Sequence, residues 1–145
     1  MKVFCDTSIL VAACLGDHPH HARARSVLLR VRDGTDEGVV AGHSLAETYA
    51  VLTRLPGAGK VPGSLVWELL ARNVVDLFTL VHLSGKEYAD WLKALALRGV
   101  EGGRVYDALI LAAAEKSKVE RIYTFNTNHF RALASARLQD LVVSP

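Results

Sequence analysis

Three acidic side chains stand alone in apolar parts of the sequence. Asp6 directly follows a short apolar run, Glu47 is the only charged residue between positions 38 and 53, and Asp107 lies in the otherwise uncharged run 105–114. A carboxylate is costly to bury without a partner. If the three acids converge, each raises the pKa of the others, and a divalent cation would relieve the repulsion. Oxygen ligands without Cys or His favour Mg²⁺ or Mn²⁺ over zinc.

Each acid also has a purely structural explanation, which the sequence leaves open. Asp6 has the position of a helix N-cap. Asp107 falls in the first turn of a predicted helix, where the macrodipole favours an acid by about 0.3–1 kcal/mol. Glu47 has no Lys or Arg three or four positions away and could face solvent on its helix.

The elements that would position these acids alternate between strand-like and helix-like runs, which favours an α/β domain. Strands are predicted over 3–5, 38–41, 77–83, 121–125 and 141–143. Helices are predicted over 7–15, 19–32, 44–55, 64–74, 84–97 and 105–116. A loop is predicted over 56–63 and a turn over 126–128. Ser84 and Glu87 have the spacing of a capping box.

Short, continuously apolar strands separated by helices are typical of a parallel sheet covered on both faces. Ligands of such sheets gather beyond the carboxyl ends of the strands. This rule directs attention to Asp6 and to the turn 126–129. The length of 145 residues predicts a single domain over 1–145.

Composition restricts the class of protein further. Half of the residues are hydrophobic and 22% are charged, which excludes intrinsic disorder. The net charge of +2 is far from the basic excess of an electrostatic nucleic-acid binder. Cys5 and Cys14 lack zinc-site spacing and are expected to be small buried residues in a reducing compartment. Neither a signal peptide nor a membrane-spanning apolar run is seen, so a soluble cytoplasmic protein is expected.

Two clusters of side chains could indicate binding sites, but we assign no binding function to either. His18, His20 and His21 lack the further partners that a zinc site needs, so no metal site is expected there. Four arginines on the predicted helix 19–32 do not form one narrow stripe; a solvated face is expected, with phosphate contact as the secondary possibility.

Four segments resemble the PIN-domain proteins, most closely the VapC-type toxins of bacterial and archaeal toxin–antitoxin pairs. The segments are Asp6-Thr7-Ser8, Ser44–Thr48, Tyr106–Ile110 and Thr124–Phe130, and the segment Arg54–Gly57 also looks like that subgroup. Each motif is weak alone, but the resemblance spans the whole chain and keeps the family's order and approximate spacing of acids.

The resemblance implies a three-layer α/β/α fold with a short parallel sheet of four to five strands. It further implies a metal-dependent endoribonuclease that cleaves RNA with a metal-activated water. Asp6, Glu47 and Asp107 would be the catalytic carboxylates and would bind Mg²⁺ or Mn²⁺ directly or through water. Thr7 and Ser8 would orient Asp6 or a water.

The resemblance also implies that Thr124 and Asn126 line the pocket, but it includes one departure. The family often carries a fourth acid just before the Phe that matches Phe130, where this sequence has His129. One metal could still bind, while a second site becomes doubtful. We expect His129 to pack beside Phe130, with an approach to the scissile phosphate as the alternative.

Partners follow from the resemblance as well: RNA, a VapB-like antitoxin, and a second copy in a homodimer or higher oligomer. Apolar residues beyond what a small sheet needs could be core or could face such a partner: Leu10, Val11, Leu15, Trp67, Leu69 and Leu70. The rival interpretations are a catalytically impaired PIN-like module that binds RNA or protein, and a phosphatase with Asp6 as nucleophile. The phosphatase would usually have a second Asp where this sequence has Ser8.

Overall fold

A parallel five-stranded sheet lies at the centre of the computed structural model, which describes residues 1–56 and 61–145. The strand order is β3-β2-β1-β4-β5, and every neighbouring pair is parallel. The strands are β1 Lys2–Cys5, β2 Glu37–Ala41, β3 Thr79–Val81, β4 Arg121–Tyr123 and β5 Val142–Val143. The predicted parallel sheet is confirmed.

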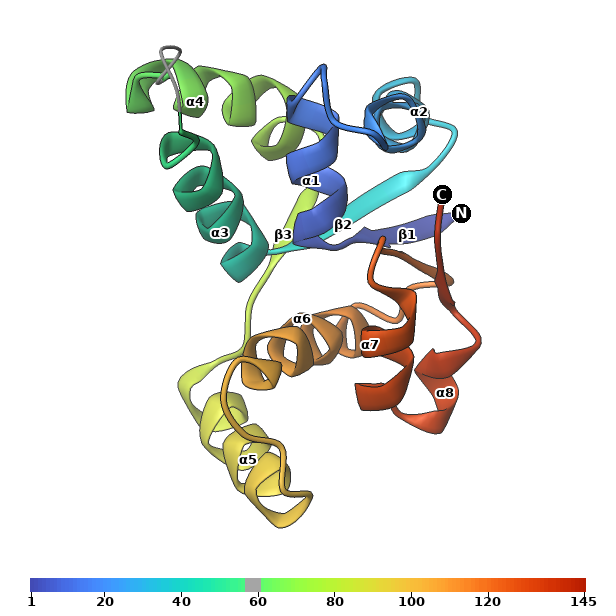
Figure 1. The fold of residues 1–145 in the computed structure, drawn as a ribbon. Helices are drawn as coiled ribbons and strands as arrows, with labels where there is room; N and C mark the ends of the chain where they lie inside the picture. Colours follow the sequence, from blue (N-terminus) through green and yellow to red (C-terminus); the bar gives the residue numbers. More distant parts are fainter. Residues whose placement is uncertain (57–60) are drawn as a thin grey trace.

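Helices cover both faces of the sheet, as Figure 1 shows. On one face lie α1 Thr7–Cys14, α2 His21–Arg32, α3 Gly42–Thr53 and α4 Gly63–Leu70, the last continued by the π-helical turn η1 Ala71–Val75. On the other lie α5 Gly85–Leu97, α6 Arg104–Lys116, α7 Thr127–Leu133 and α8 Ala136–Gln139. The predicted three-layer α/β/α architecture is therefore confirmed.

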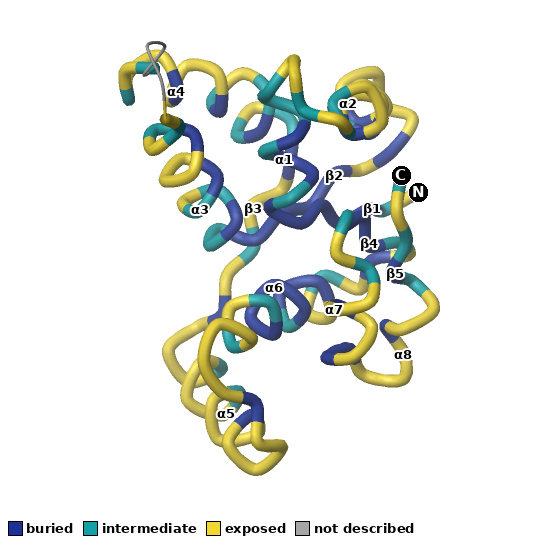
Figure 2. Tube along the Cα trace, in the orientation of Figure 1, coloured by how far each residue is buried: buried dark blue, intermediate teal, exposed yellow. Residues whose placement is uncertain are grey.

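The continuously apolar strands reflect two cores, one on each side of the sheet. Val3 and Cys5 pack with the layer of α1 and α2, while Phe4 packs with the layer of α6 and α7. In β2, Val40 packs with the layer of α1 and α2, and Val39 packs with the layer of α6 and α7. Because successive strand residues point to opposite faces, a strand buried on both faces needs apolar residues at every position. The buried sheet is visible in Figure 2.

The third predicted strand is shorter and more exposed than expected. It covers Thr79–Val81 rather than 77–83, and Thr79 and Leu80 are exposed. The prediction of full burial was wrong here because β3 is an edge strand, paired only with β2. Phe78 and Leu83, on either side of it, are buried and account for the apolar pattern.

The chain after β4 also differs from prediction. The predicted turn 126–128 is the beginning of α7, with Asn126 as its N-cap. Neither α7 nor α8 was predicted. Local sequence favours a turn through Asn and Thr, but Phe130 and Leu133 are buried in the core one helical turn apart, and this packing outweighs the local preference. Residues 57–60 of the predicted loop 56–63 lie outside the described residues.

Helix α5 begins with the predicted capping box. The Ser84 hydroxyl accepts from the Glu87 amide at 3.2 Å, and the Glu87 carboxylate accepts from the Ser84 amide at 2.6 Å. Most of α5 is exposed and projects away from the sheet (Figures 1 and 2). Leu95 is its buried residue, and Lys116 of α6 forms an ion pair with Glu87 at 2.7 Å.

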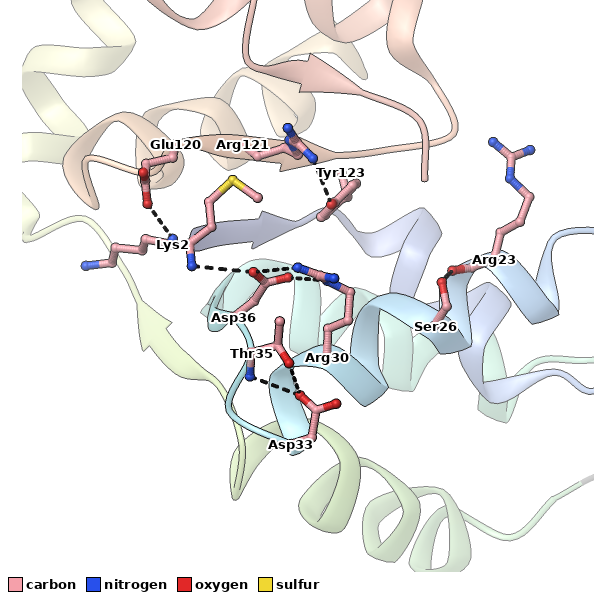
Figure 3. Close-up of polar contacts among 11 residues, drawn as sticks. Lys2, Arg23, Ser26, Arg30, Asp33, Thr35, Asp36, Glu120, Arg121 and Tyr123 are labelled. Atoms are coloured by element: carbon pink, nitrogen blue, oxygen red, sulfur yellow. Dashed lines mark hydrogen bonds and ion pairs between the residues drawn. The ribbon is translucent and has the colours of Figure 1, made fainter.

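A buried carboxylate joins α2 to β2 at the end of the sheet away from the three predicted site acids. Arg30 Nε donates to Asp36 Oδ2 at 2.7 Å and a terminal guanidinium nitrogen donates to Oδ1 at 3.1 Å (Figure 3). The Asp36 side chain is only 1% exposed. The Arg30 hydrogen bond lowers the pKa of Asp36 below its ordinary value, although burial opposes this.

Both cysteines are free thiols, with Cys5 buried and Cys14 half-buried. Burial raises the pKa of both and brings that of Cys14 to about 11, so each is a neutral apolar group as expected. Within residues 1–56 and 61–145, none of the helices has the length and apolar character required to span a bilayer.

Candidate active site

The three isolated acids line one open pocket of about 600 Å³ beyond the carboxyl end of the sheet. Asp6 follows β1 and caps α1, Glu47 lies on α3, and Asp107 lies in the first turn of α6. The parallel sheet brings Asp6 and Glu47 together, because the chain leaves β1 and β2 at the same edge before it enters α1 and α3. Helix α6 follows α5 rather than a strand, and its packing against β2 and α3 brings Asp107 to the same edge. Acids that are far apart in sequence therefore share one cavity.

Asp6 is the buried member of the set, with only 3% of its surface exposed. Its Oδ2 accepts from the Ser8 hydroxyl at 2.7 Å, from the Thr124 hydroxyl at 2.8 Å and from the Ser8 amide at 3.3 Å. The last bond makes Asp6 the N-cap of α1, so the structural explanation holds at the same time as the placement in the pocket. Because all three bonds converge on Oδ2, Oδ1 keeps most of its capacity to accept.

Burial raises the pKa of Asp6 above its ordinary value. The hydrogen bonds from Ser8 and Thr124, with smaller ones from the backbone of Ser8 and Thr7, oppose that rise. A cation beside Oδ1 would compensate for the lost hydration of the charged form.

Glu47 and Asp107 are more exposed, with 42% and 30% of their side chains accessible. Thr7 donates its hydroxyl to Glu47 at 2.6 Å. Thr7 was expected to orient Asp6 or a water. Its backbone does hydrogen-bond Asp6, but its hydroxyl is directed to Glu47, because Thr7 begins α1 where that helix packs against α3. His43 lies 3.9 Å from Glu47 and stacks on the exposed ring of Tyr106.

His129 does not pack beside Phe130 as expected. Its side chain is 65% exposed, and its Nδ1 lies 3.2 Å from Asp107 Oδ2. Phe130 is fully buried. Consecutive residues on a helix point about 100° apart, so the burial of Phe130 turns His129 outward, toward the neighbouring α6.

Ser8 and Thr124 join the ends of β1 and β4 around Asp6. The Ser8 oxygen also accepts from the Phe125 amide at 3.1 Å, and the Thr124 oxygen accepts from the Asn126 amide at 3.0 Å. Ser8 and Asn126 line the pocket, whereas Thr124 is fully buried behind it. The pocket role expected for Thr124 is therefore an indirect one: it holds Asp6 in place.

One wall of the pocket consists of residues that sequence reasoning did not assign to it: Val11, His18, Pro19, His20, Val51 and Phe125. The two histidines belong to the connection between α1 and α2, and His20 stacks on Phe125. No local signal in the sequence links these segments, since Phe125 follows β4 more than a hundred residues later.

The residues present suit a hard cation, with one restriction. Asp6, Glu47 and Asp107 offer only oxygen ligands, which Mg²⁺ and Mn²⁺ prefer. In the part of the chain that the structure describes, no three His, Cys, Asp or Glu side chains are close enough to hold one ion together. At least one of these three carboxylates would therefore reach a shared cation through water.

The chain matches a known family and curated proteins over most of its length. A family model described as PIN domain matches residues 3–136. Ribonuclease VapC27 of Mycobacterium tuberculosis is 33% identical over 116 residues, which are 79% of this chain and 78% of the relative. Ribonuclease VapC40 of the same organism is 35% identical over 106 residues, 72% of each chain.

Solved structures show the same fold at lower sequence identity. VapC20 of Mycobacterium tuberculosis, described as a sarcin–ricin loop cleaving toxin, superimposes with a TM-score of 0.69 at 18% identity, covering 99% of both chains. VapBC2 of Rickettsia felis, solved bound to a DNA fragment from its promoter, gives a TM-score of 0.61 at 18% identity, covering 91% of this chain and 92% of the other.

Proposed function

Because the chain belongs to the PIN-domain family and, within it, to the VapC ribonucleases, we propose that it is a metal-dependent endoribonuclease. One observation carries the proposal: Asp6 is buried at the pocket with three hydrogen-bond donors on one oxygen, while Glu47 and Asp107 line the same cavity. Burial of a carboxylate costs free energy unless hydrogen bonds, an opposite charge or a metal compensate for the lost hydration.

The side chains of the site have two roles: hydroxyl groups orient the carboxylates, and the carboxylates would bind the cation. Ser8 and Thr124 fix Asp6, and Thr7 fixes Glu47, so that both carboxylates keep their orientation without rearrangement during the reaction. Asp107 on the first turn of α6 completes the acidic wall. These three acids would hold Mg²⁺ or Mn²⁺, directly or through water.

A bound divalent cation supplies a water of lowered pKa and neutralises charge on the phosphate. A cation held by these acids would also change the sign of the local field, so that the acidic pocket would attract the RNA backbone. It would thereby reconcile a net charge of only +2 with a nucleic-acid substrate. Asn126, exposed at the pocket, is available to contact the substrate.

We further propose that the chain is the toxin of a VapBC-type pair, with a protein antitoxin and a second copy of itself as partners. The relatives that are named VapC, together with the fold shared with the Rickettsia felis VapBC2 structure, support this. Trp67 and Leu69 on α4 are exposed apolar residues available to a partner, whereas Leu10 and Leu70 are core residues.

A catalytically impaired binding module remains the second candidate, because His129 contacts Asp107 where the family often has another acid. The decisive variant is Asp6→Asn. Under the proposal, purified wild-type protein cleaves RNA with Mg²⁺ or Mn²⁺ and inhibits growth on expression, and Asp6→Asn loses at least about a hundredfold of the cleavage rate. A wild-type protein that cleaves no RNA once free of partners would contradict the ribonuclease proposal.

Asp90→Asn is the matched control for this experiment. Asp90 is an exposed carboxylate on α5 whose recorded contact is an ion pair with Lys86, four residues earlier. Such pairs contribute little to stability, so this variant should cleave RNA as the wild type does. Circular dichroism of all three proteins checks that they are folded.

Binding of the cation is tested separately from activity. A ligand that binds only the folded state raises Tm by mass action. Mg²⁺ or Mn²⁺ at millimolar concentration should raise the Tm of the wild type and of Asp90→Asn relative to EDTA, and should leave the Tm of Asp6→Asn unchanged. Equal shifts in all three proteins would place the cation elsewhere.

A further inference from the structure

We propose that His20, supported by Phe125, is a platform on which a base of the RNA substrate stacks beside the acids, so that His20 is a positioning residue for substrate. This rests on the proposed ribonuclease function and adds to it a recognition element. The starting observation is that His20 and Phe125 line the same pocket as Asp6, Glu47 and Asp107.

The two rings form an ordered stack. The His20 and Phe125 centroids are 4.4 Å apart with an interplanar angle of 22°, and the Arg23 guanidinium lies 5.5 Å from the Phe125 centroid. His20 is only half-buried and lines the pocket, so part of its surface is open to the cavity. The stack therefore presents an aromatic surface at a fixed place in the cavity.

The position of His20 is held by its backbone rather than by its ring. His20 is the N-cap of α2 but makes no side-chain cap hydrogen bond. Its amide donates to His18 Nδ1 at 3.1 Å, and the His18 ring tilts by 53° at 5.7 Å from the His20 ring. The imidazole of His20 thus contributes little to the helix, and a change of this side chain should alter the pocket without altering the fold.

The aromatic ring beside the acids indicates which part of the substrate it contacts. An aromatic ring beside a phosphodiester-cleaving centre meets the base of a nucleotide whose phosphate is at the acids, and every base has a face that stacks. Bases inside an A-form duplex are paired and stacked on each other and cannot reach such a ring. The platform therefore engages an unpaired nucleotide next to the scissile phosphate.

His21 is a natural control beside His20. Its Nδ1 lies 3.0 Å from the Ala12 carbonyl oxygen, and its ring lines a separate, smaller pocket with Arg25 and Arg32. Loss of the His21 ring removes an imidazole of the same chemistry from the same segment but from outside the proposed platform.

The experiment measures cleavage and binding of a fluorescein-labelled single-stranded RNA of mixed sequence. Stacking on one aromatic side chain predicts that His20→Ala raises KM roughly tenfold with little change in kcat. His20→Phe, which keeps a stacking ring, should restore a KM near that of the wild type. His21→Ala should not raise KM. A merely structural role of the ring would lower the Tm of His20→Ala, whereas loss of a substrate contact leaves its Tm near that of the wild type.

Removal of the base provides the complementary test. Once the cut position is mapped, an abasic nucleotide is placed on either side of it. At one of these two positions the abasic RNA should raise the KM of the wild type roughly tenfold and leave that of His20→Ala unchanged, because both changes remove the same contact. Independent, additive effects at both positions would overturn the platform.

The two proposals fail in distinguishable ways. If the wild type cleaves RNA and His20→Ala has an unchanged KM, the platform is wrong while the ribonuclease stands. If the wild type cleaves nothing, binding of the same RNA to the Asp6→Asn protein is measured by anisotropy. A roughly tenfold weaker Kd on adding His20→Ala supports the platform in a binding module, and an unchanged Kd or no binding overturns it.

Discussion

Asp6 shows how one residue serves both the local fold and the site. As N-cap it satisfies an amide at the start of α1, and the hydrogen bonds that do so leave its other oxygen for the pocket. Its two hydroxyl partners come from α1 and from the end of β4, so its position depends on two distant segments. A structural explanation for an acid therefore does not argue against a functional one.

Asp36 is a purely structural acid, which makes it a test of pH dependence away from the pocket. Its pKa in the folded protein is lowered by Arg30, so its contribution to stability is complete above the ordinary value near 3.8 and disappears as pH falls through the lower folded value. Asp36→Asn should lower the free energy of unfolding by about 1–3 kcal/mol at pH 7. The loss should shrink below pH 4, as measured by urea denaturation.

Asp33→Asn is the control for this prediction. Asp33 ends α2 nearby, is exposed, and accepts from the Thr35 amide and hydroxyl (Figure 3). Asparagine can accept the same bonds. An equal loss of stability in both variants at pH 7 would mean that the ion pair between Arg30 and the buried Asp36 carboxylate does not contribute to stability.

At the scale of elements, α5 is tied to the rest of the protein by few features. Leu95 is buried, and Lys116 reaches Glu87, but most of the helix faces solvent (Figure 2). Because α5 buries little apolar surface against the core, the stability of its first turn depends on the local capping box formed by Ser84 and Glu87.

Ser84→Ala should therefore destabilise α5 more than the rest of the fold. Loss of an N-cap costs about 1 kcal/mol, and amide hydrogen exchange in α5 should accelerate roughly fivefold while exchange in the central strands is little changed. Ser84→Asp, which can still accept from the helix, should exchange as the wild type does. Uniform acceleration across the molecule would instead show that α5 unfolds only with the whole protein.

At the scale of the whole molecule, the sheet and the helix layer above it leave no room for a side chain at Gly38. A Cβ at this position would lie 2.5 Å from a ring carbon of Phe78 and 2.7 Å from a methyl of Val31. These atoms belong to α2 and to the segment before β3, so the close approach is a property of the assembled layers.

Gly38→Ala should overpack this contact and lower the free energy of unfolding by about 1–3 kcal/mol. Gly16→Ala is its matched control, because Gly16 has no atom within 4 Å of an added Cβ and no positive φ. That variant should be neutral or slightly stabilising. Equal urea midpoints for the two variants would show that the layers separate at little cost.

The order of strands and helices up to α6 was largely predictable, because the apolar residues of each element follow the spacing that a buried strand or a one-sided helix requires. The apolar runs at β1 and β2 and the helical spacing of α3 are local properties, as is the capping box at Ser84. The isolation of Asp6, Glu47 and Asp107 among apolar neighbours is also written in the sequence. The parallel-sheet rule directed attention to the edge at which Asp6 lies, whereas convergence of all three acids was an open hypothesis that the fold confirmed.

Contacts between side chains were decided only by tertiary packing. The Thr7 hydroxyl donates to Glu47, His129 turns to Asp107 because Phe130 enters the core, and His20 lies on Phe125. Each of these pairs joins segments that the sequence separates by at least 22 residues. Local periodicity determines which face of an element is buried, but which partner that face meets depends on how the two helical layers fit against the sheet.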